Sequence, residues 1–151
     1  MSDPLFQDHT PRLGLPLLFA GQSQREIFVN EALARLDALV DCAIEAQLPA
    51  PPAAPAEGKS WLVATGASGA WTGQGGAIAC LQQGQWLFQP PVDGLRLLNK
   101  ATGQYLHYLG SWRMAAKPSS PTGGTVIDVQ ARSTIGALIT ALVEAGILAA
   151  Q

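Results

Sequence analysis

The pattern of hydrophobic and polar residues predicts a helix close to the N-terminus. Ser23 is followed three residues later by Glu26, the spacing of a capping box, in which both side chains satisfy backbone amides at a helix start. Beyond it, apolar residues recur in steps of four and three, which keeps them on one side of a helix; they are Val29, Leu33, Leu36, Val40 and Ala43. This seam either packs on the core of its own domain or is shared with copies of the same helix, and periodicity alone leaves both interpretations open.

A second seam with the same spacing predicts a C-terminal helix. Thr125 or Asp128 can cap its start and Gly146 can end it. Its apolar positions are Ala131, Ile135, Leu138, Leu142 and Ala145. After Arg132 the only charged residue in this segment is Glu144, so an isolated helix of this sequence would be poorly soluble. We therefore expect it to pack on other protein, most simply in a self-associated bundle.

The region between the two helices changes to short runs rich in Trp, Leu, Val, Ile and Tyr that alternate with glycines. The runs are 60–65, 77–81, 85–89, 95–99, 104–109 and 111–114. Such runs, separated by glycine turns, predict a compact antiparallel β unit. The two-residue link Gln83-Gly84 predicts a tight hairpin, because glycine readily adopts the positive φ that such turns need.

The predicted fold is therefore α+β, with an N-terminal amphipathic helix, a small antiparallel β unit rich in Trp and Gly, and a C-terminal apolar helix. Proline-rich and Ser/Gly-rich stretches suggest the boundaries between these parts. The parts are a flexible arm at 1–12, a helical base at 13–48, a Pro-rich spacer at 49–58, the β unit at 59–114, a linker at 115–124 and the C-terminal helix at 125–151.

Three tryptophans each follow a glycine turn, in Gly69-Ala70-Trp71, Gly84-Gln85-Trp86 and Gly110-Ser111-Trp112. An indole offers a large contact area at a low cost in conformational entropy. The structural interpretation is that the three indoles form the core of a small sheet. The functional interpretation is that Trp71, Trp86 and Trp112 form a stacking platform for the sugar rings of a glycan.

Charge argues for burial in an assembly and against nucleic acid as a partner. The chain has 151 residues and a formal net charge of −2, which provides no cationic field for phosphate backbones. Charged residues make up 13%, about half of the usual share, so few are available to cover a free monomer. The apolar runs are shorter than the roughly 20 residues of a membrane helix, and the acids and prolines near the start do not suit a signal peptide. We expect no membrane insertion.

No constellation for catalysis or for binding a metal or cofactor stands out. His9 lies in the predicted arm, and His107 lies between two tyrosines without an acid close by in the chain. A catalytic triad or a metal site would need partners from elsewhere, and the β unit offers no facing pair of carboxylates. Cys42 and Cys80 lack metal-ligand spacing and are expected to be buried free thiols, with a disulfide as the alternative. We expect no enzyme.

Several of these segments resemble the DUF2793 family. The resemblance begins in Leu15-Pro16-Leu17-Leu18, 21–26 and 30–40, and continues in Gly69-Ala70-Trp71 and 84–88. Members of that family occur in tailed phages, prophages and gene-transfer-agent particles, so the resemblance implies a virion component and no particular chemistry. One departure is Leu95, where the family often has Trp after the glycine; this puts a ligand contact at that position in doubt.

Two hypotheses follow from the pattern and the resemblance together. The first is a structural virion protein, assembled in the bacterial host cytoplasm, that forms a homo-oligomeric base, adaptor or short fibre or spike. A trimer is favoured, with the two seams docking against sister subunits and other virion proteins. The alternative is a receptor-binding module that recognises a host-surface glycan through exposed tryptophans.

Overall fold

The computed structural model describes residues 9–18, 21, 25–119, 122–123 and 128–149. It confirms the α+β class and divides the chain into two compact units, Met1–Pro91 and Val92–Gln151, hereafter the N-terminal and the C-terminal unit. The division falls inside the segment that the sequence predicted as one β unit, because the strands within 60–89 and those within 96–113 belong to different sheets.

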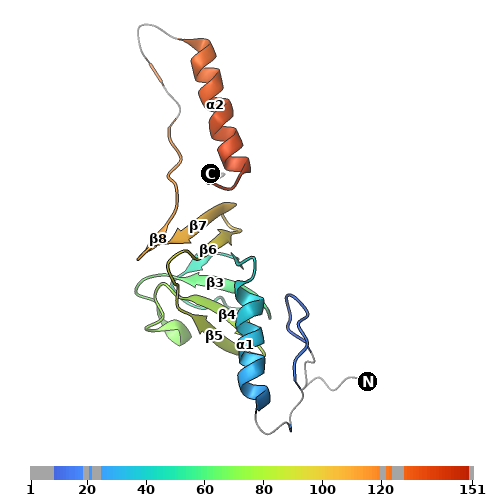
Figure 1. Cartoon of the computed structure of the whole chain (residues 1–151). Helices are drawn as coiled ribbons and strands as arrows, with labels where there is room; N and C mark the ends of the chain where they lie inside the picture. The colour runs from blue at the N-terminus through green and yellow to red at the C-terminus, as the bar shows by residue number, and fades with distance from the viewer. Residues whose placement is uncertain (1–8, 19–20, 22–24, 120–121, 124–127, 150–151) are drawn as a thin grey trace. The chain divides into compact units, whose positions relative to one another are not determined.

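Among its described residues, the N-terminal unit contains one α-helix and a four-stranded sheet. Figure 1 traces the course of the chain through these elements. Its elements are α1 (Arg25–Leu39), β1 (Ala43–Ile44), β2 (Gln47–Leu48), β3 (Ser60–Val63), the 3-10 helix η1 (Gly69–Trp71), β4 (Ile78–Gln82) and β5 (Gln85–Gln89). The sheet order is β2-β3-β4-β5, in which β2 runs parallel to β3 and the other pairs are antiparallel.

The N-terminal helix is shorter than the predicted helical base 13–48. It ends at Leu39, and Asp41 takes the left-handed conformation at φ 46°, which turns the chain into β1 and β2. The predicted spacer at 49–58 is fastened to the sheet and does not separate parts of the fold: Ser68 N donates to Pro49 O, and Gly58 N donates to Leu81 O, both at 2.9 Å.

The predicted hairpin at Gln83-Gly84 is confirmed. Gln82 pairs with Gln85 across the turn, and both turn residues have positive φ, 51° and 70°. The Glu57 carboxylate accepts hydrogen bonds from Gln83 N at 2.7 Å and Gly84 N at 2.6 Å. A side chain from the loop before β3 therefore closes the turn. The β4–β5 hairpin is therefore a fixed edge of the sheet.

Tryptophans form the centre of the N-terminal core. Trp61, Val63, Trp71 and Ala79 are buried together, with Trp86 and Phe88 packed against them. The Trp71 and Trp86 ring centroids are 5.1 Å apart at 84°, and the Trp61 and Trp86 centroids 5.7 Å apart at 77°. Such edge-to-face pairs contribute about 0.5–1.5 kcal/mol beyond their area burial. The core interpretation is thus correct for Trp71 and Trp86.

Among its described residues, the C-terminal unit contains three short strands in an antiparallel ladder and a helix. The elements are β6 (Arg96–Asn99), β7 (Gln104–Tyr108), β8 (Trp112–Arg113) and α2 (Val129–Glu144). Asp128 caps α2 as predicted, its side chain accepting from Ala131 N at 2.8 Å, whereas Thr125 lies outside the described residues.

The end of α2 is fastened to β7. Gly146 has φ +69° and follows the C-cap, as predicted, and Leu148 is buried where the chain folds back. Tyr105 N donates to Gly146 O at 2.7 Å, and the Gln104 side chain donates to Ile147 O at 2.8 Å. These bonds hold the tail after α2 on the strand.

Candidate functional site

The N-terminal unit has a cavity of about 360 Å³ between its first described segment, α1 and the β4–β5 hairpin, here called the α1 groove. This volume is at the lower end of the range of small-molecule sites. The groove is lined by Thr10, Pro11 and Leu17 of the first segment, by Glu26, Ile27, Asn30, Glu31 and Ala34 of α1, and by Gln82, Gln83, Gln85, Trp86 and Leu87 of the hairpin.

One wall of the groove is held by a buried carboxylate on α1. Asp37 is fully buried and accepts hydrogen bonds from Thr10 Oγ1 at 2.9 Å, Arg12 N at 3.1 Å and Leu13 N at 2.5 Å. The Arg12 guanidinium donates to the backbone oxygens of Asp37 and Asp41. Within the predicted arm 1–12, Thr10 and Arg12 are thus hydrogen-bonded to a charged acceptor on α1, and residues 1–8 lie outside the described residues.

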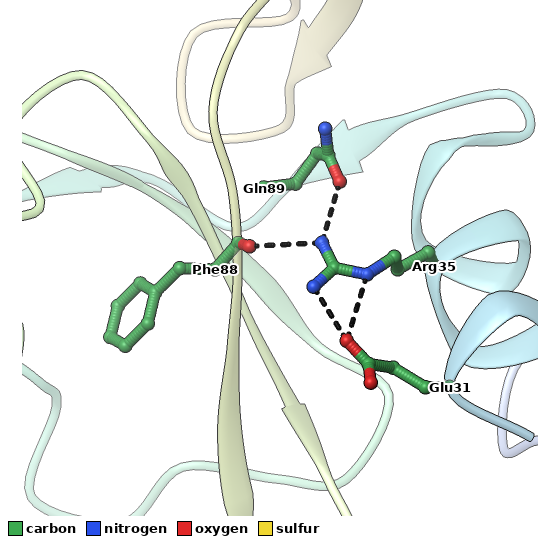
Figure 2. A network of polar contacts seen from close by, with 4 residues as sticks. All are labelled: Glu31, Arg35, Phe88 and Gln89. Carbon is green, nitrogen blue, oxygen red and sulfur yellow. Dashed lines mark hydrogen bonds and ion pairs between the residues drawn. The ribbon is translucent and has the colours of Figure 1, made fainter. Parts of the chain in front are cut away.

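The opposite wall is tied to α1 by Arg35 (Figure 2). Its Nη1 donates to Phe88 O at 3.2 Å and to Gln89 Oε1 at 2.9 Å, and its Nη2 pairs with Glu31 at 2.7 Å. One guanidinium thus joins the helix to β5 and neutralises one of the two carboxylates of the groove. The walls of the groove are fixed by polar contacts on both sides.

Glu26 supplies the groove with a hydrogen-bond acceptor. Its Oε2 is buried and has no hydrogen-bond partner among the described residues, whereas its Oε1 accepts from Gly21 N at 3.2 Å. The predicted capping partner, Ser23, lies outside the described residues. A buried acceptor without a donor costs free energy, which a ligand hydroxyl or ammonium group in the groove would offset. Beside it, the half-buried Trp86 offers an apolar surface.

The structure does not bring the three predicted glycan-binding tryptophans together. Trp71 has no exposed surface, so the prediction that it stacks on a sugar ring is wrong. Trp86 borders the α1 groove. Trp112 is half-buried in the C-terminal unit, where it lies opposite Tyr108 with ring centroids 5.3 Å apart. A single indole, that of Trp86, therefore lines this cavity.

The predicted seam of α1 faces solvent in the single chain. Val29, Leu36 and Val40 are exposed, with Leu36 at 51%, and Leu33 is half-buried. Next to Val29, Ile27 and Phe28 are exposed at 62% and 76%. The buried positions of the helix are Asp37 and Ala38.

The predicted seam of α2 is open as well. Among its described residues α2 has no buried side chain; Ile135 and Leu138 are exposed, Leu138 at 60%, and Leu142 is half-buried. Neither helix covers its apolar side within its own unit.

The residues considered for chemistry are dispersed. Cys42 and Cys80 are buried free thiols, as expected; burial raises the pKa of Cys42 to about 11 and raises the pKa of Cys80. His107 is exposed on β7. Across the described ranges, no three His, Cys, Asp or Glu side chains gather as metal ligands, and no helix has the length and apolar character needed to cross a membrane.

Sequence reasoning missed Asp37 and Arg35, which hold the two walls of the groove. A signal for Asp37 was present: an acid stands directly between Leu36 and Ala38 in a predicted helix. This signal could be interpreted only with knowledge of which side of the helix faces the sheet.

Comparison with known proteins places the chain in a sequence family. A family model described as "Protein of unknown function (DUF2793)" matches residues 29–113, which include most of α1 and all the strands of both units. No curated protein matches the chain.

Proposed function

The chain belongs to the DUF2793 family, whose function is unknown, and we propose that it is a homo-oligomeric structural protein of a tailed phage or phage-like particle. In this role it is a base, adaptor or short fibre or spike that docks on other virion proteins and presents its β strands. A trimer is the assembly we expect, formed in the bacterial host cytoplasm and carried in the virion.

The observation that carries this proposal is the exposure of both seams. Val29 and Leu36 of α1 lie seven residues apart, Val40 follows directly after the helix, and all three side chains are exposed. Burying one Leu or Val side chain contributes about 1.5–3 kcal/mol, and half of that is still to be gained for a half-exposed side chain. Three such positions on each helix amount to several kcal/mol for each protomer.

The second helix supports the same proposal. α2 is 16 residues long, about 24 Å, and none of its side chains is buried within the described residues. Its seam follows the heptad spacing of helices that pack against each other. A second copy of the same helix offers a matching apolar surface. Self-association therefore covers the seam without requiring a different protein as partner.

The oligomeric state tests the proposal directly. Mass photometry and light scattering of the full chain should give an oligomer at micromolar concentration. Leu36→Glu and Leu138→Glu should both shift the mass towards the monomer, because each places a charge in a seam. The matched control Ser133→Glu adds the same charge at an exposed α2 position off the seam and should leave the mass unchanged. A wild-type chain that remains monomeric would refute the proposal.

A second candidate function is recognition of a host-surface glycan, and the lining of the α1 groove favours it. An indole beside carboxylate and amide groups can stack on a sugar ring and bond its hydroxyls. Binding to an array of capsular and lipopolysaccharide fragments should then weaken in Glu26→Gln and Trp86→Phe. The control Trp112→Phe changes an indole outside the groove and should bind normally. If the wild-type chain bound no fragment of the array, this function would be rejected.

A further inference from the structure

The strands β6, β7 and β8 of the C-terminal unit carry a row of basic side chains. Arg96 of β6 pairs with His107 of β7, and His107 pairs with Arg113 of β8. Directly paired residues of an antiparallel sheet project from the same face, with Cβ atoms about 5 Å apart. All three residues are exposed. The register therefore sets three basic groups side by side, although they are 11 and 6 residues apart in the chain.

Contacts within the unit hold both arginines in place without neutralising them. The Arg96 Cζ atom lies 4.8 Å from the centroid of the Tyr105 ring, and Arg113 Nη2 donates to Leu109 O at 3.2 Å. Within the described part of the chain, no acidic side chain forms an ion pair with any member of the row. The nearby carboxylate of Asp93 accepts from Gly110 N at 2.7 Å instead.

A cavity of about 270 Å³ opens beside the row. It is lined by Arg96, Tyr105, Leu106, His107, Ala115 and Ile147. The tail after α2 contributes Ile147 to this lining, and the bonds from β7 to Gly146 and Ile147 hold that wall in place. The concavity is thus built from elements that are fastened to one another.

The two guanidinium groups are positively charged, and they lie on the same face of the sheet, one strand to either side of His107. Guanidinium groups present a planar fork of N–H donors that fits the oxygens of a carboxylate or phosphate. We propose that Arg96, His107 and Arg113 bind a single compact oxyanion, a carboxylate or phosphate group, at the mouth of this cavity.

The geometry restricts the ligand to one small anionic group. Neighbouring strands are about 4.8 Å apart, so the row spans about 10 Å, and both guanidinium groups can converge on one group above His107. Three basic residues in a chain of net charge −2 do not make the extended cationic track that a nucleic-acid backbone requires. The inference is independent of the oligomeric state and of the α1 groove.

Titration of the isotope-labelled full chain with inorganic phosphate and, separately, with glucuronate tests this site by NMR at constant ionic strength. Saturable shifts confined to the strands that carry Arg96, His107 and Arg113 are expected. R96Q and R113Q should each weaken binding about tenfold, since each removes a charge-assisted pair of hydrogen bonds. K59Q, which removes an exposed cation from the other unit, should bind like wild type.

The outcomes distinguish the source of the anion and can overturn the proposal. Saturation by phosphate alone indicates a phosphate ester, and saturation by glucuronate alone indicates an acidic sugar or another carboxylate. The spectra of R96Q and R113Q must match wild type away from β6 to β8, which excludes loss of the fold as the reason for weaker binding. The proposal is overturned if neither anion saturates, if K59Q weakens binding equally, or if binding is seen only with a long polyanion such as heparin.

Discussion

Replacing Asp37 by Asn should release residues 10–13 from α1 while leaving the rest of the N-terminal unit folded. Asp37 is fully buried, and its carboxylate accepts from the amides of Arg12 and Leu13 and from the Thr10 hydroxyl. Asparagine has nearly the same shape but only one acceptor oxygen. Its NH₂ group would face donors that now bond to a carboxylate oxygen.

The size of the effect follows from those bonds. A hydrogen bond to a charged acceptor contributes about 1.5–3 kcal/mol and one to a neutral acceptor about 1 kcal/mol. Two backbone amides that share a carboxylate therefore lose about 3 kcal/mol when one neutral oxygen remains. Because Asp37 is shielded from solvent, screening by water does not reduce this value. Local opening at Arg12 and Leu13 should become on the order of a hundredfold more frequent.

Amide hydrogen exchange measured residue by residue by NMR is the appropriate assay. The control is Asp41→Asn, which removes the same charge at an exposed position whose backbone oxygen, and not its side chain, accepts from Arg12. Exchange at Arg12 and Leu13 should accelerate in Asp37→Asn and stay unchanged in Asp41→Asn. Equal exchange rates in wild type and Asp37→Asn would show that the carboxylate does not hold this segment, and the wall of the α1 groove would then need another explanation.

Three further predictions concern the core, the tail and the buried thiols. Trp71→Ala should lower the free energy of unfolding by about 3–5 kcal/mol in urea denaturation, because it leaves a cavity among the other indoles; a loss below 1 kcal/mol would contradict a tryptophan core. Gly146→Ala should detach the tail from β7 and expose it to protease, since the new Cβ would lie 2.9 Å from Tyr105 Cδ2 at a φ of +69°; unchanged cleavage would contradict this. The Cys42 thiol ionises near its ordinary pKa of 9.0 in the unfolded chain and near 11 in the folded one, so its contribution to stability is complete below pH 9 and is lost as pH rises towards about 11. In urea unfolding across this window, the free energy of unfolding should fall by about 2–3 kcal/mol more in wild type than in Cys42→Ala, and parallel pH profiles of the two proteins would contradict this.

The features of the fold that depend on neighbouring residues could be predicted from the sequence. The Gln83-Gly84 turn, the Asp128 cap and the Gly146 helix end each rest on the conformation or hydrogen bonding of adjacent residues. The strands β1 and β2 could not be predicted in this way. β2 pairs with β3 in parallel, Gln47 opposite Leu62, so its partner lies 15 residues further along the chain. The continued apolar spacing to Ala43 favoured a longer helix instead.

The candidate sites were harder to predict, because they depend on which faces of the elements meet. The sequence selected Trp71 and Trp86 by the same Gly-x-Trp pattern, yet packing buries the first completely and leaves the second at the α1 groove. The row of Arg96, His107 and Arg113 exists only once the register of three strands is fixed, since a shift of one residue would point His107 to the other face.

The way α1 is attached to its unit explains why its seam remains free. The helix is joined to the sheet and to residues 10–13 by Arg35 and Asp37, both polar, while its apolar side points outwards. The sheet is stabilised by the tryptophan core and by the β4–β5 hairpin, whose turn is bonded to Glu57, and neither of these buries the seam. An amphipathic helix that served only its own domain would be oriented the other way, with Leu36 inside and Asp37 outside. An exposed apolar stripe of this kind lowers solubility unless it is covered, and this is the physical reason for our proposal that α1 packs against a second copy of the chain.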